Sequence, residues 1–336
     1  MQRVGIIGAG AWGTALAVVA RRAGRDVVIW ALEREVIAAV NDRHCNTLYL
    51  PEVALDPAII ATADVARSAN VDIVMLVAPA QHLRGVCVSL APHLKPGIPV
   101  VSCAKGIERG TSALMTDVVG ETLPQAVMMV LSGPTFAREV ALGLPTAITL
   151  GAADQALGRQ VAEAIGTPAF RPYLTDDVVG AEIGGAVKNV LAIGCGMAEG
   201  KGLGANARAA LLTRGLAEIV RLALARGGRP ETLMGLSGLG DLVLTATSLQ
   251  SRNYSLGVAL GQGQTLDQVL GARRSVTEGV TTAEAVATLA VKLKVDMPIC
   301  AAIDKVLNHG AAIDDMLRGL LERPLRDEVD AAVKRI

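Results

Sequence analysis

The chain has 336 residues, of which 51% are hydrophobic and 19% are charged, and its 32 basic and 32 acidic side chains balance to zero formal charge. The balanced charge excludes a protein that binds nucleic acid through overall basicity, and the high apolar content excludes disorder over most of the chain. Aromatic residues make up only 2% of the chain, too few for a base-stacking platform. This length predicts about two domains.

The five cysteines and four histidines are scattered along the chain, and no C-x-x-C motif occurs. We therefore expect neither a disulfide framework nor a bound metal, and we predict a reducing, cytoplasmic location. Residues 4–20 carry no charge and superficially resemble a signal peptide, but four glycines interrupt this stretch. No membrane span and no nucleic-acid partner are expected.

Up to residue 175, short apolar runs alternate with helix-like stretches at 11–23, 80–91 and 154–165. The runs are rich in Val and Ile and are often apolar at consecutive positions, which is typical of strands buried on both faces of a mainly parallel sheet. The predicted strands are Val4–Ile7, Val27–Trp30, Ile73–Val77, Ile98–Ser102, Val127–Leu131 and Ala147–Leu150. This alternation predicts an α/β fold, with a Rossmann-like doubly wound domain over residues 1–175.

After Pro172 we find no convincing strand pattern, and helix signals take over. A first-turn proline and two capping boxes, in which a hydroxyl residue is followed three positions later by Gln or Glu, indicate helix starts. These signals lie at Thr175–Asp177, Pro230, Thr265 with Gln268, and Thr281 with Glu284. The sequence thus predicts an all-α C-terminal domain over residues 176–336.

A glycine-rich turn joins the first predicted strand to the first predicted helix. Gly8, Gly10 and Gly13 form a G-x-G-x-x-G pattern in the strand-to-helix context that dinucleotide binding requires. The first glycine permits the tight turn, the second allows close approach of a pyrophosphate, and the third allows close helix packing. A packing turn that binds nothing, an FAD site and an S-adenosylmethionine site remain alternatives to a nicotinamide dinucleotide.

The end of the second strand should select between NAD and NADP. A carboxylate there would bind the ribose hydroxyls of NAD, whereas an arginine would suit the 2′-phosphate of NADP. Trp30 is followed by both Glu33 and Arg34, so the residues give opposite signals.

Six further blocks in fixed order and spacing carry a more specific signal. They are Ser102–Glu108, Ser132–Ala137, Gly185–Val190, Gly238–Leu242, Ser251–Asn253 and Thr277–Val280. Together with the glycine-rich turn, and over about residues 3–325, the chain resembles the bacterial NAD(P)-dependent sn-glycerol-3-phosphate dehydrogenases. Leu32 departs from this family, whose members often carry His or Arg at that place, so the choice between NAD(H) and NADP(H) stays open.

The resemblance implies reversible hydride transfer between NAD(P)H and dihydroxyacetone phosphate, which gives sn-glycerol 3-phosphate for phospholipid synthesis. It implies that Lys188 is the proton acceptor and also contacts substrate. The other substrate contacts that it implies are Lys105, Gly133, Thr135, Asp241, Ser251, Arg252 and Asn253. Besides the three glycines of the turn, the expected cofactor contacts are Ala11, Trp12, Arg34, Lys105, Ala137, Arg252, Val276 and Glu278.

The charged residues among these also suggest chemical roles by their position in the sequence. Lys188 lies in the otherwise uncharged stretch 183–193, where a lysine is costly unless it is paired or functional; the alternative is a side chain that reaches solvent. Lys105 follows a buried strand, at the sheet edge where α/β folds bind ligands, although an ordinary loop residue would also fit. Asp241 could balance Lys188, accept a substrate hydroxyl or cap a helix. Arg252 and its two neighbours could bind a phosphate or form a surface turn.

Two other functions stay open. One is a related dehydrogenase with a helical domain, acting on β-hydroxyacids or ketopantoate. The other is a non-catalytic protein that binds NAD(H) as a sensor or scaffold, which would need the glycine-rich turn but not Lys188. The expected partner is a small-molecule substrate, and the apolar helical half could also contain the interface of a homodimer.

Overall fold

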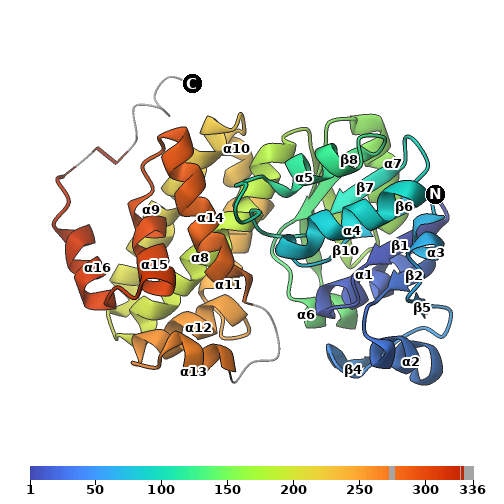
Figure 1. Ribbon diagram of the computed structural model, residues 1–336, viewed down its shortest axis with the longest axis horizontal. Helices are drawn as coiled ribbons and strands as arrows, with labels where there is room; N and C mark the ends of the chain where they lie inside the picture. Colours follow the sequence, from blue (N-terminus) through green and yellow to red (C-terminus); the bar gives the residue numbers. More distant parts are fainter. Residues whose placement is uncertain (272–276, 326, 329–336) are drawn as a thin grey trace.

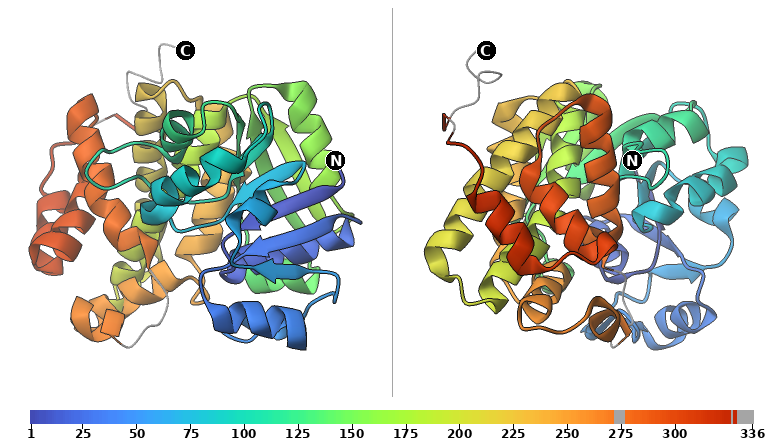
Figure 2. Two further views of the ribbon diagram at one scale, coloured as in Figure 1. Left: turned by 45° about the vertical axis from the view of Figure 1, so that its right-hand side comes forward. Right: turned by 60° about the vertical axis from the view of Figure 1, so that its left-hand side comes forward.

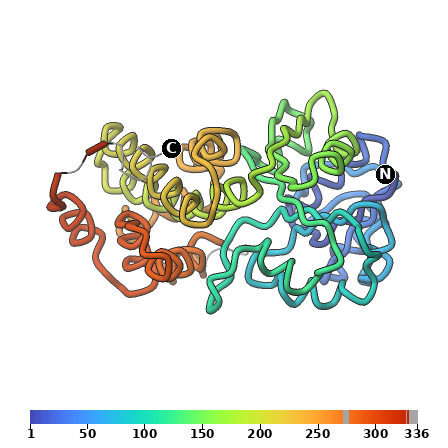
Figure 3. The backbone as a smooth tube through the Cα atoms, turned by 90° about the horizontal axis from the view of Figure 1, so that it is seen from above, coloured from blue at the N-terminus to red at the C-terminus, as the bar shows by residue number. Residues whose placement is uncertain are grey.

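The computed structural model describes residues 1–271, 277–325 and 327–328, and these form two lobes that lie side by side (Figure 1). One lobe is a Rossmann-like N-terminal domain, and the other is a helical C-terminal region that begins after Thr175. Seen from above, the chain passes from one lobe into the other near the middle of the molecule (Figure 3). The predicted division between sheet-containing and all-helical parts thus agrees with the order of the elements.

The N-terminal domain is built on an eight-stranded sheet in the order β10-β9-β8-β7-β6-β1-β2-β5, in which every neighbouring pair is parallel except β8 with β9. The strands are β1 (Arg3–Ile7), β2 (Asp26–Trp30), β5 (Ile60–Thr62), β6 (Ile73–Leu76), β7 (Pro99–Ser102), β8 (Val127–Ser132), β9 (Thr146–Ala152) and β10 (Phe170–Thr175). All six predicted strands are confirmed. Four further strands were not predicted from the sequence: β5, β10 and the short antiparallel pair β3 (Cys45–Asn46) and β4 (Leu50–Ala54).

Helices cover both faces of the sheet (Figure 2). Consecutive residues of a strand point to opposite faces, so Ile6 belongs to one apolar cluster and Ile7 to the other. The first cluster contains residues of α1 (Ala11–Arg22), α2 (Arg34–Arg43), α6 (Ala137–Leu142) and α7 (Gln155–Ile165). The second contains residues of α3 (Val65–Ala69), the short helix η1 (Ala80–His82), α4 (Leu83–Leu90) and α5 (Met115–Thr122), with η2 (Ala91–His93) after α4.

No strand follows Thr175 within the described residues. The helical elements are α8 (Val178–Gly200), α9 (Gly204–Ala225), α10 (Pro230–Leu233), a π-helical turn η3 (Leu236–Gly240), α11 (Asp241–Ala246), α12 (Arg252–Gly261), α13 (Leu266–Gly271), α14 (Glu278–Leu293), α15 (Pro298–His309) and α16 (Ile313–Leu321). The helix starts at Asp177, Pro230 and Thr265 are confirmed. The capping box at Thr281 and Glu284 is wrong, because α14 already begins at Glu278 and Glu284 pairs with Arg109 instead.

Helix α8 is the central element of the helical region, and 19 of its residues, from Gly180 to Ala198, are buried. By length and composition it could cross a membrane, but 89% of its most apolar window is buried inside the protein, as in a core helix. Glycines at 196 and 200 on α8 and at 257 and 261 on α12 let the two helices touch backbone to backbone. A Cβ atom on Gly257 would lie 2.0 Å from the carbonyl oxygen of Ile193, so no larger residue fits this crossing.

Candidate active site

The glycine-rich turn lies where the order of the strands reverses, between β1 and β6. Gly8 has φ +119°, and a Cβ atom there would lie 2.9 Å from the carbonyl group of Val77 at the end of β6. A Cβ atom on Gly13 would lie 1.9 Å from the oxygen of Gly8, whereas one on Gly10 would meet nothing within 4 Å. A side chain at Gly8 or Gly13 would thus collide with backbone, as expected for a tight turn and a close helix contact, and the backbone at Gly10 is open to a ligand.

The residues around this turn fit a dinucleotide. Gly10 precedes α1 and offers no side chain to cap the helix, so the first backbone N–H groups of α1 and its positive dipole end are available to a pyrophosphate. Trp12, in the first turn of α1, has a buried indole N–H without a hydrogen-bond partner in the described part of the chain. Ala11 is partly buried beside it. An uncapped helix start and an unpaired donor are what a bound phosphate-containing ligand would satisfy.

The segment 46–49 forms hydrogen bonds both to the glycine-rich turn and to Glu33, which follows β2, and the sequence analysis did not predict them. Asn46, which is fully buried, donates to the carbonyl oxygen of Ala9 at 2.8 Å, and Tyr49 donates its hydroxyl to Glu33 at 2.9 Å. Partial burial and the Glu33 carboxylate raise the pKa of Tyr49, so this hydroxyl remains a donor. Arg34, the first residue of α2, is exposed. Glu33 is thus fixed in place whereas Arg34 reaches into solvent.

Helix α8 packs closely against η3 and against the end of β8 at a pair of glycines. A Cβ atom on Gly184 would lie 2.5 Å from the carbonyl oxygen of Ser237, and one on Gly185 would lie 2.4 Å from the hydroxyl of Ser132 at the end of β8. Lys188 follows Gly184 by four residues and therefore lies on the same face of the helix. The two glycines thereby bring Lys188 to the carboxyl end of the sheet, where Lys105 follows β7.

Lys188 and Lys105 share the carboxylate of Asp241. The ammonium group of Lys188 bonds to Oδ1 of Asp241 and donates to the hydroxyl of Thr245 at 2.7 Å. Nζ of Lys105 donates to Oδ2 of Asp241 at 2.8 Å and to the carbonyl oxygen of Gly133 at 3.0 Å. Lys188 is only 5% exposed, so it does not reach into solvent. Asp241 is fully buried and is the first residue of α11, whose N-cap is Gly240, so Asp241 does not cap this helix. Two ammonium groups around one carboxylate leave an excess positive charge.

Burial is the main cause that lowers the pKa of Lys188, to about 8, and the positive charge of Lys105 acts in the same direction, while the Asp241 carboxylate opposes both. A lysine with this pKa is partly neutral near neutral pH and can accept or donate a proton. The pKa of Glu278, at the start of α14, is raised chiefly by burial. The positive charges of Arg252, Lys105 and Lys188 act in the opposite direction and lower the pKa of Glu278, so these four residues lie near one another.

The three neighbouring residues predicted to bind a phosphate, Ser251, Arg252 and Asn253, differ in their contacts. Ser251 caps α12 by accepting a hydrogen bond from the backbone N–H of Tyr254 at 3.2 Å. Asn253 donates to the side chain of Asn189 at 3.0 Å and accepts from the backbone N–H of Gly279 at 3.1 Å. Arg252, the first residue of α12, is exposed at the same helix start. Of the three, the arginine has the side chain best placed to reach a ligand.

The remaining predicted residues lie at the edges of the site. The hydroxyl of Thr135 donates to the carbonyl oxygen of Gly133 at 3.2 Å, and Ala137 begins α6. Val276 lies outside the described residues. The sequence reading missed Thr245, although its spacing of four residues from Asp241 places both on one face of α11. It also missed Asn189, the neighbour of Lys188, whose side chain donates to the carbonyl oxygen of Lys105 at 3.5 Å.

A doubly wound sheet with an open glycine-rich turn at its switch point, next to a buried lysine of lowered pKa, defines a dinucleotide-dependent dehydrogenase. Comparison with known proteins agrees. The family model described as NAD-dependent glycerol-3-phosphate dehydrogenase matches residues 3–158 with its N-terminal part and residues 177–318 with its C-terminal part. The chain therefore belongs to the NAD-dependent glycerol-3-phosphate dehydrogenase family, and it is an oxidoreductase that uses NAD(H) or NADP(H).

Individual relatives support the same assignment. The glycerol-3-phosphate dehydrogenase [NAD(P)+] of Caulobacter vibrioides is 58% identical over 97% of this chain and 99% of its own length. The enzyme of the same name from Rhodospirillum rubrum is 60% identical over 98% of this chain and 94% of its own. The crystal structure of glycerol-3-phosphate dehydrogenase from Coxiella burnetii superposes with a TM-score of 0.92, at 38% identity, covering 96% of this chain and 99% of the other.

Proposed function

We propose that the chain interconverts dihydroxyacetone phosphate and sn-glycerol 3-phosphate, with Lys188 as the group that donates and accepts the proton. The observation that supports this role is the buried Lys188, which shares the carboxylate of Asp241 with the partly buried Lys105 at the carboxyl end of the nucleotide-binding sheet. The proposed substrate comes from the names of the relatives, and the proposed proton transfer comes from the arrangement of the site.

Reduction of a ketone creates negative charge on the carbonyl oxygen, which must be protonated, and the reverse oxidation needs a base on the hydroxyl. The ammonium form of Lys188 donates this proton, and its neutral form takes the proton back. Lys105 adds a second positive charge that stabilises the developing oxyanion. Asp241 holds both ammonium groups, and Thr245 fixes the direction of Nζ of Lys188.

The nicotinamide group supplies or takes the hydride when it is bound. Gly8, Gly10, Ala11, Trp12 and Gly13 would hold the pyrophosphate, and Ala137, Glu278 and Val276 stay predicted cofactor contacts. Gly133, Thr135, Ser251 and Asn253 likewise stay predicted substrate contacts. Glu33, held by Tyr49, favours the free ribose hydroxyls of NAD, whereas Arg34 would have to turn toward a 2′-phosphate, so we infer a preference for NADH.

Several wider features belong to the same proposal. Catalysis would take place between a Rossmann-like domain over residues 1–175 and a helical domain over residues 176–336. The product would supply phospholipid synthesis in the cytoplasm. A homodimer stays a prediction of the sequence.

The proposal is tested by following NADH and NADPH oxidation with dihydroxyacetone phosphate. We expect the wild-type chain to turn over both, with the higher kcat/KM for NADH. Lys188→Met should lower kcat by ~10²–10⁴-fold while NADH binding, measured by fluorescence, stays unchanged. Lys95→Met, which removes an exposed lysine before β7, is the matched control and should match the wild type. A Lys188→Met variant with near-normal kcat would show that another group transfers the proton.

Arg252 separates this reaction from that of related dehydrogenases whose substrates lack a phosphate. A guanidinium group that binds the phosphate should contribute mainly to substrate binding. Arg252→Ala should therefore raise KM for dihydroxyacetone phosphate by ~10-fold or more, and change the weak activity with unphosphorylated dihydroxyacetone much less. Equal losses with both substrates would argue against a phosphate contact.

A further inference from the structure

The loop that carries Lys105 is anchored in the helical region and not only in its own domain. Residues 105–114, here called the 105–114 loop, follow β7 and are closed by an antiparallel bridge between Ile107 and Leu114. Both side chains are fully buried, and both belong to the apolar core of the helical region. In that core they join Val187 and Val190, the residues on α8 that flank Lys188.

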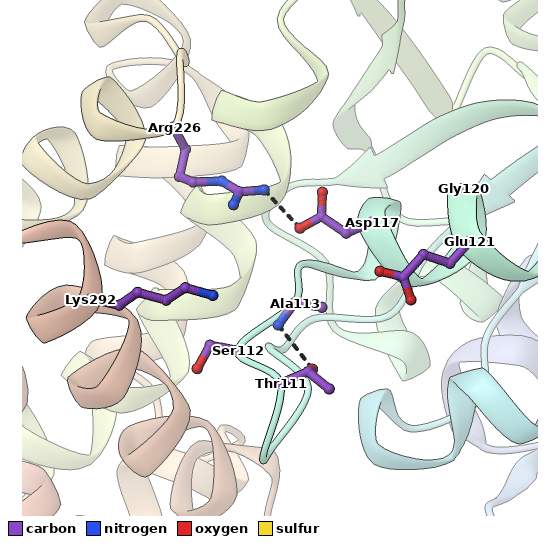
Figure 4. A pocket seen from close by; sticks show the side chains of 8 residues that line it. All are labelled: Thr111, Ser112, Ala113, Asp117, Gly120, Glu121, Arg226 and Lys292. Carbon is purple, nitrogen blue, oxygen red and sulfur yellow. Dashed lines mark hydrogen bonds and ion pairs between the residues drawn. The ribbon is translucent and has the colours of Figure 1, made fainter.

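The tip of the loop contributes little to this anchoring. It borders an open polar pocket of about 450 Å³ between the two lobes, lined by Thr111, Ser112 and Ala113 on one side and by Arg226 and Lys292 on the other (Figure 4). The ion pair of Arg109 with Glu284 is largely exposed, and such pairs contribute little to stability. Apart from the polar contacts of Lys105 with Asp241 and Asn189, the two apolar side chains at the base of the loop are therefore its main attachment to the helical region.

The backbone between Ile107 and Lys105 has little freedom to absorb a shift. A Cβ atom on Gly106 would lie 2.7 Å from the Cβ of Ala80, and the carbonyl oxygen of Ile107 accepts a hydrogen bond from Gln81 at 2.8 Å. Movement of Ile107 would thus be passed on to Lys105, whose ammonium group is bound to Asp241.

We propose that Ile107 and Leu114 are positioning residues, which set the distance between Lys105 and Lys188 by inserting into the core of the helical region. This inference rests on the proposed role of Lys188 as proton donor and acceptor. It assigns to two apolar residues, whose side chains carry no acid–base group, the task of holding together a site built from two lobes.

Displacement of Lys105 would change the charge around Lys188. The groups that face Lys188 are Asp241 and Thr245 from α11, Lys105 from the loop, and Glu278 from α14. If Lys105 moves away, Lys188 loses a neighbouring positive charge and no longer shares Asp241. Both changes stabilise its charged form, so the pH at which Lys188 loses its proton must rise.

The experiment compares kcat for dihydroxyacetone phosphate reduction against pH in Ile107→Ala, Ile107→Val and the control Ile219→Ala. Ile219 is fully buried in the same core but lies on α9, which carries none of the site residues. We expect Ile107→Ala to lower kcat by ~10-fold or more and to move the alkaline fall of kcat upward by ~0.5–1 pH unit, with NADH binding unchanged. Ile107→Val should keep kcat and the alkaline fall of kcat close to those of the wild type. Ile219→Ala should lower thermal stability without moving the pH profile.

A pH profile of Ile107→Ala that coincides with that of Ile219→Ala would overturn the inference. If Ile107→Ala does not fold, Leu114→Ala, at the other side chain of the bridge, provides the same comparison, and an unmoved pH profile in that variant would also overturn the inference. Lys188→Met tests the underlying role separately: near-normal kcat in that variant rejects the proton-transfer proposal itself, whatever the loop variants show.

Discussion

At the scale of single residues, the site depends on how one carboxylate is divided between two lysines. Asp241 is fully buried and its two oxygens face different ammonium groups. Because burial lowers the pKa of Lys188 to about 8 and Asp241 opposes this change, the operating pH of the enzyme is set by the balance of the two effects.

This balance predicts opposite pH dependences for the two directions of the reaction. Reduction needs the charged form of Lys188, so its kcat should fall as pH rises through about 8, whereas kcat for glycerol 3-phosphate oxidation should rise over the same range. Steady-state kinetics from pH 6 to 10 measures both. Two profiles that move in the same direction would contradict the assignment.

Removal of the opposing charge should shift these profiles. Asp241→Asn takes away the carboxylate that favours the charged form of Lys188, so the fall in kcat for reduction should move to lower pH, by about one unit or more. Asp314→Asn, which removes an exposed partner of Lys201, is the control and should leave the profile unchanged. An upward shift in Asp241→Asn would show that Asp241 does not stabilise the charged lysine.

At the scale of elements, the close crossing of α8 and α12 fixes the position of Lys188 on α8 relative to Arg252 on α12. Gly257→Ala would place a methyl group 2.0 Å from the carbonyl oxygen of Ile193, so the helices must separate. We expect a loss of ~1–3 kcal/mol in the free energy of unfolding and a raised KM, because α12 carries Arg252.

Gly319→Ala is a matched control for this variant. Gly319 lies within α16 and has nothing within 4 Å of its missing Cβ, so the alanine should be neutral or stabilising by ~0.5–1 kcal/mol. Urea denaturation and steady-state kinetics measure both effects. Equal stability of the two variants would mean that the α8–α12 contact tolerates a larger separation.

The strands that could be predicted from the sequence are those whose apolar pattern reflects burial in the middle of the sheet. The six predicted strands are apolar runs buried on both faces, but β10 contains Pro172 and the half-exposed Tyr173 at the sheet edge and shows no such run. Lys105, Lys188 and Asp241, which the structure brings together, were singled out because they lie in blocks whose order and spacing resemble one family. Asn46 and Thr245 were missed, since their roles arise only when segments distant in sequence come together.

At the scale of the whole molecule, a second buried carboxylate links the two lobes. Glu182 on α8 accepts hydrogen bonds from the backbone N–H of Thr116 at 3.0 Å and from its hydroxyl at 2.6 Å. Thr116 lies on α5 in the N-terminal domain. Burial is the main cause that raises the pKa of Glu182 to about 7, and the nearby Asp117 adds to it.

This raised pKa predicts how stability depends on pH. Between about pH 4.5 and 7 the folded chain retains a proton on Glu182 that the unfolded chain has lost, so the free energy of unfolding should fall as pH rises, by about 3 kcal/mol in total. Glu182→Gln should remove this part of the pH dependence in urea denaturation. Glu121→Gln, at an exposed ion pair, is the control and should keep the wild-type slope; an equal slope in all three proteins would contradict the prediction.

The apolar character of α8 also affects how the protein is made. The segment from Val178 to Gly200 leaves the ribosome before α12, α14 and α15, the helices that later enclose it, have been synthesised. During that interval the nascent chain displays a stretch that resembles a membrane anchor. Its apolar surface therefore stays without its native partners until the downstream helices have been added, and exposed apolar surface of this kind favours aggregation.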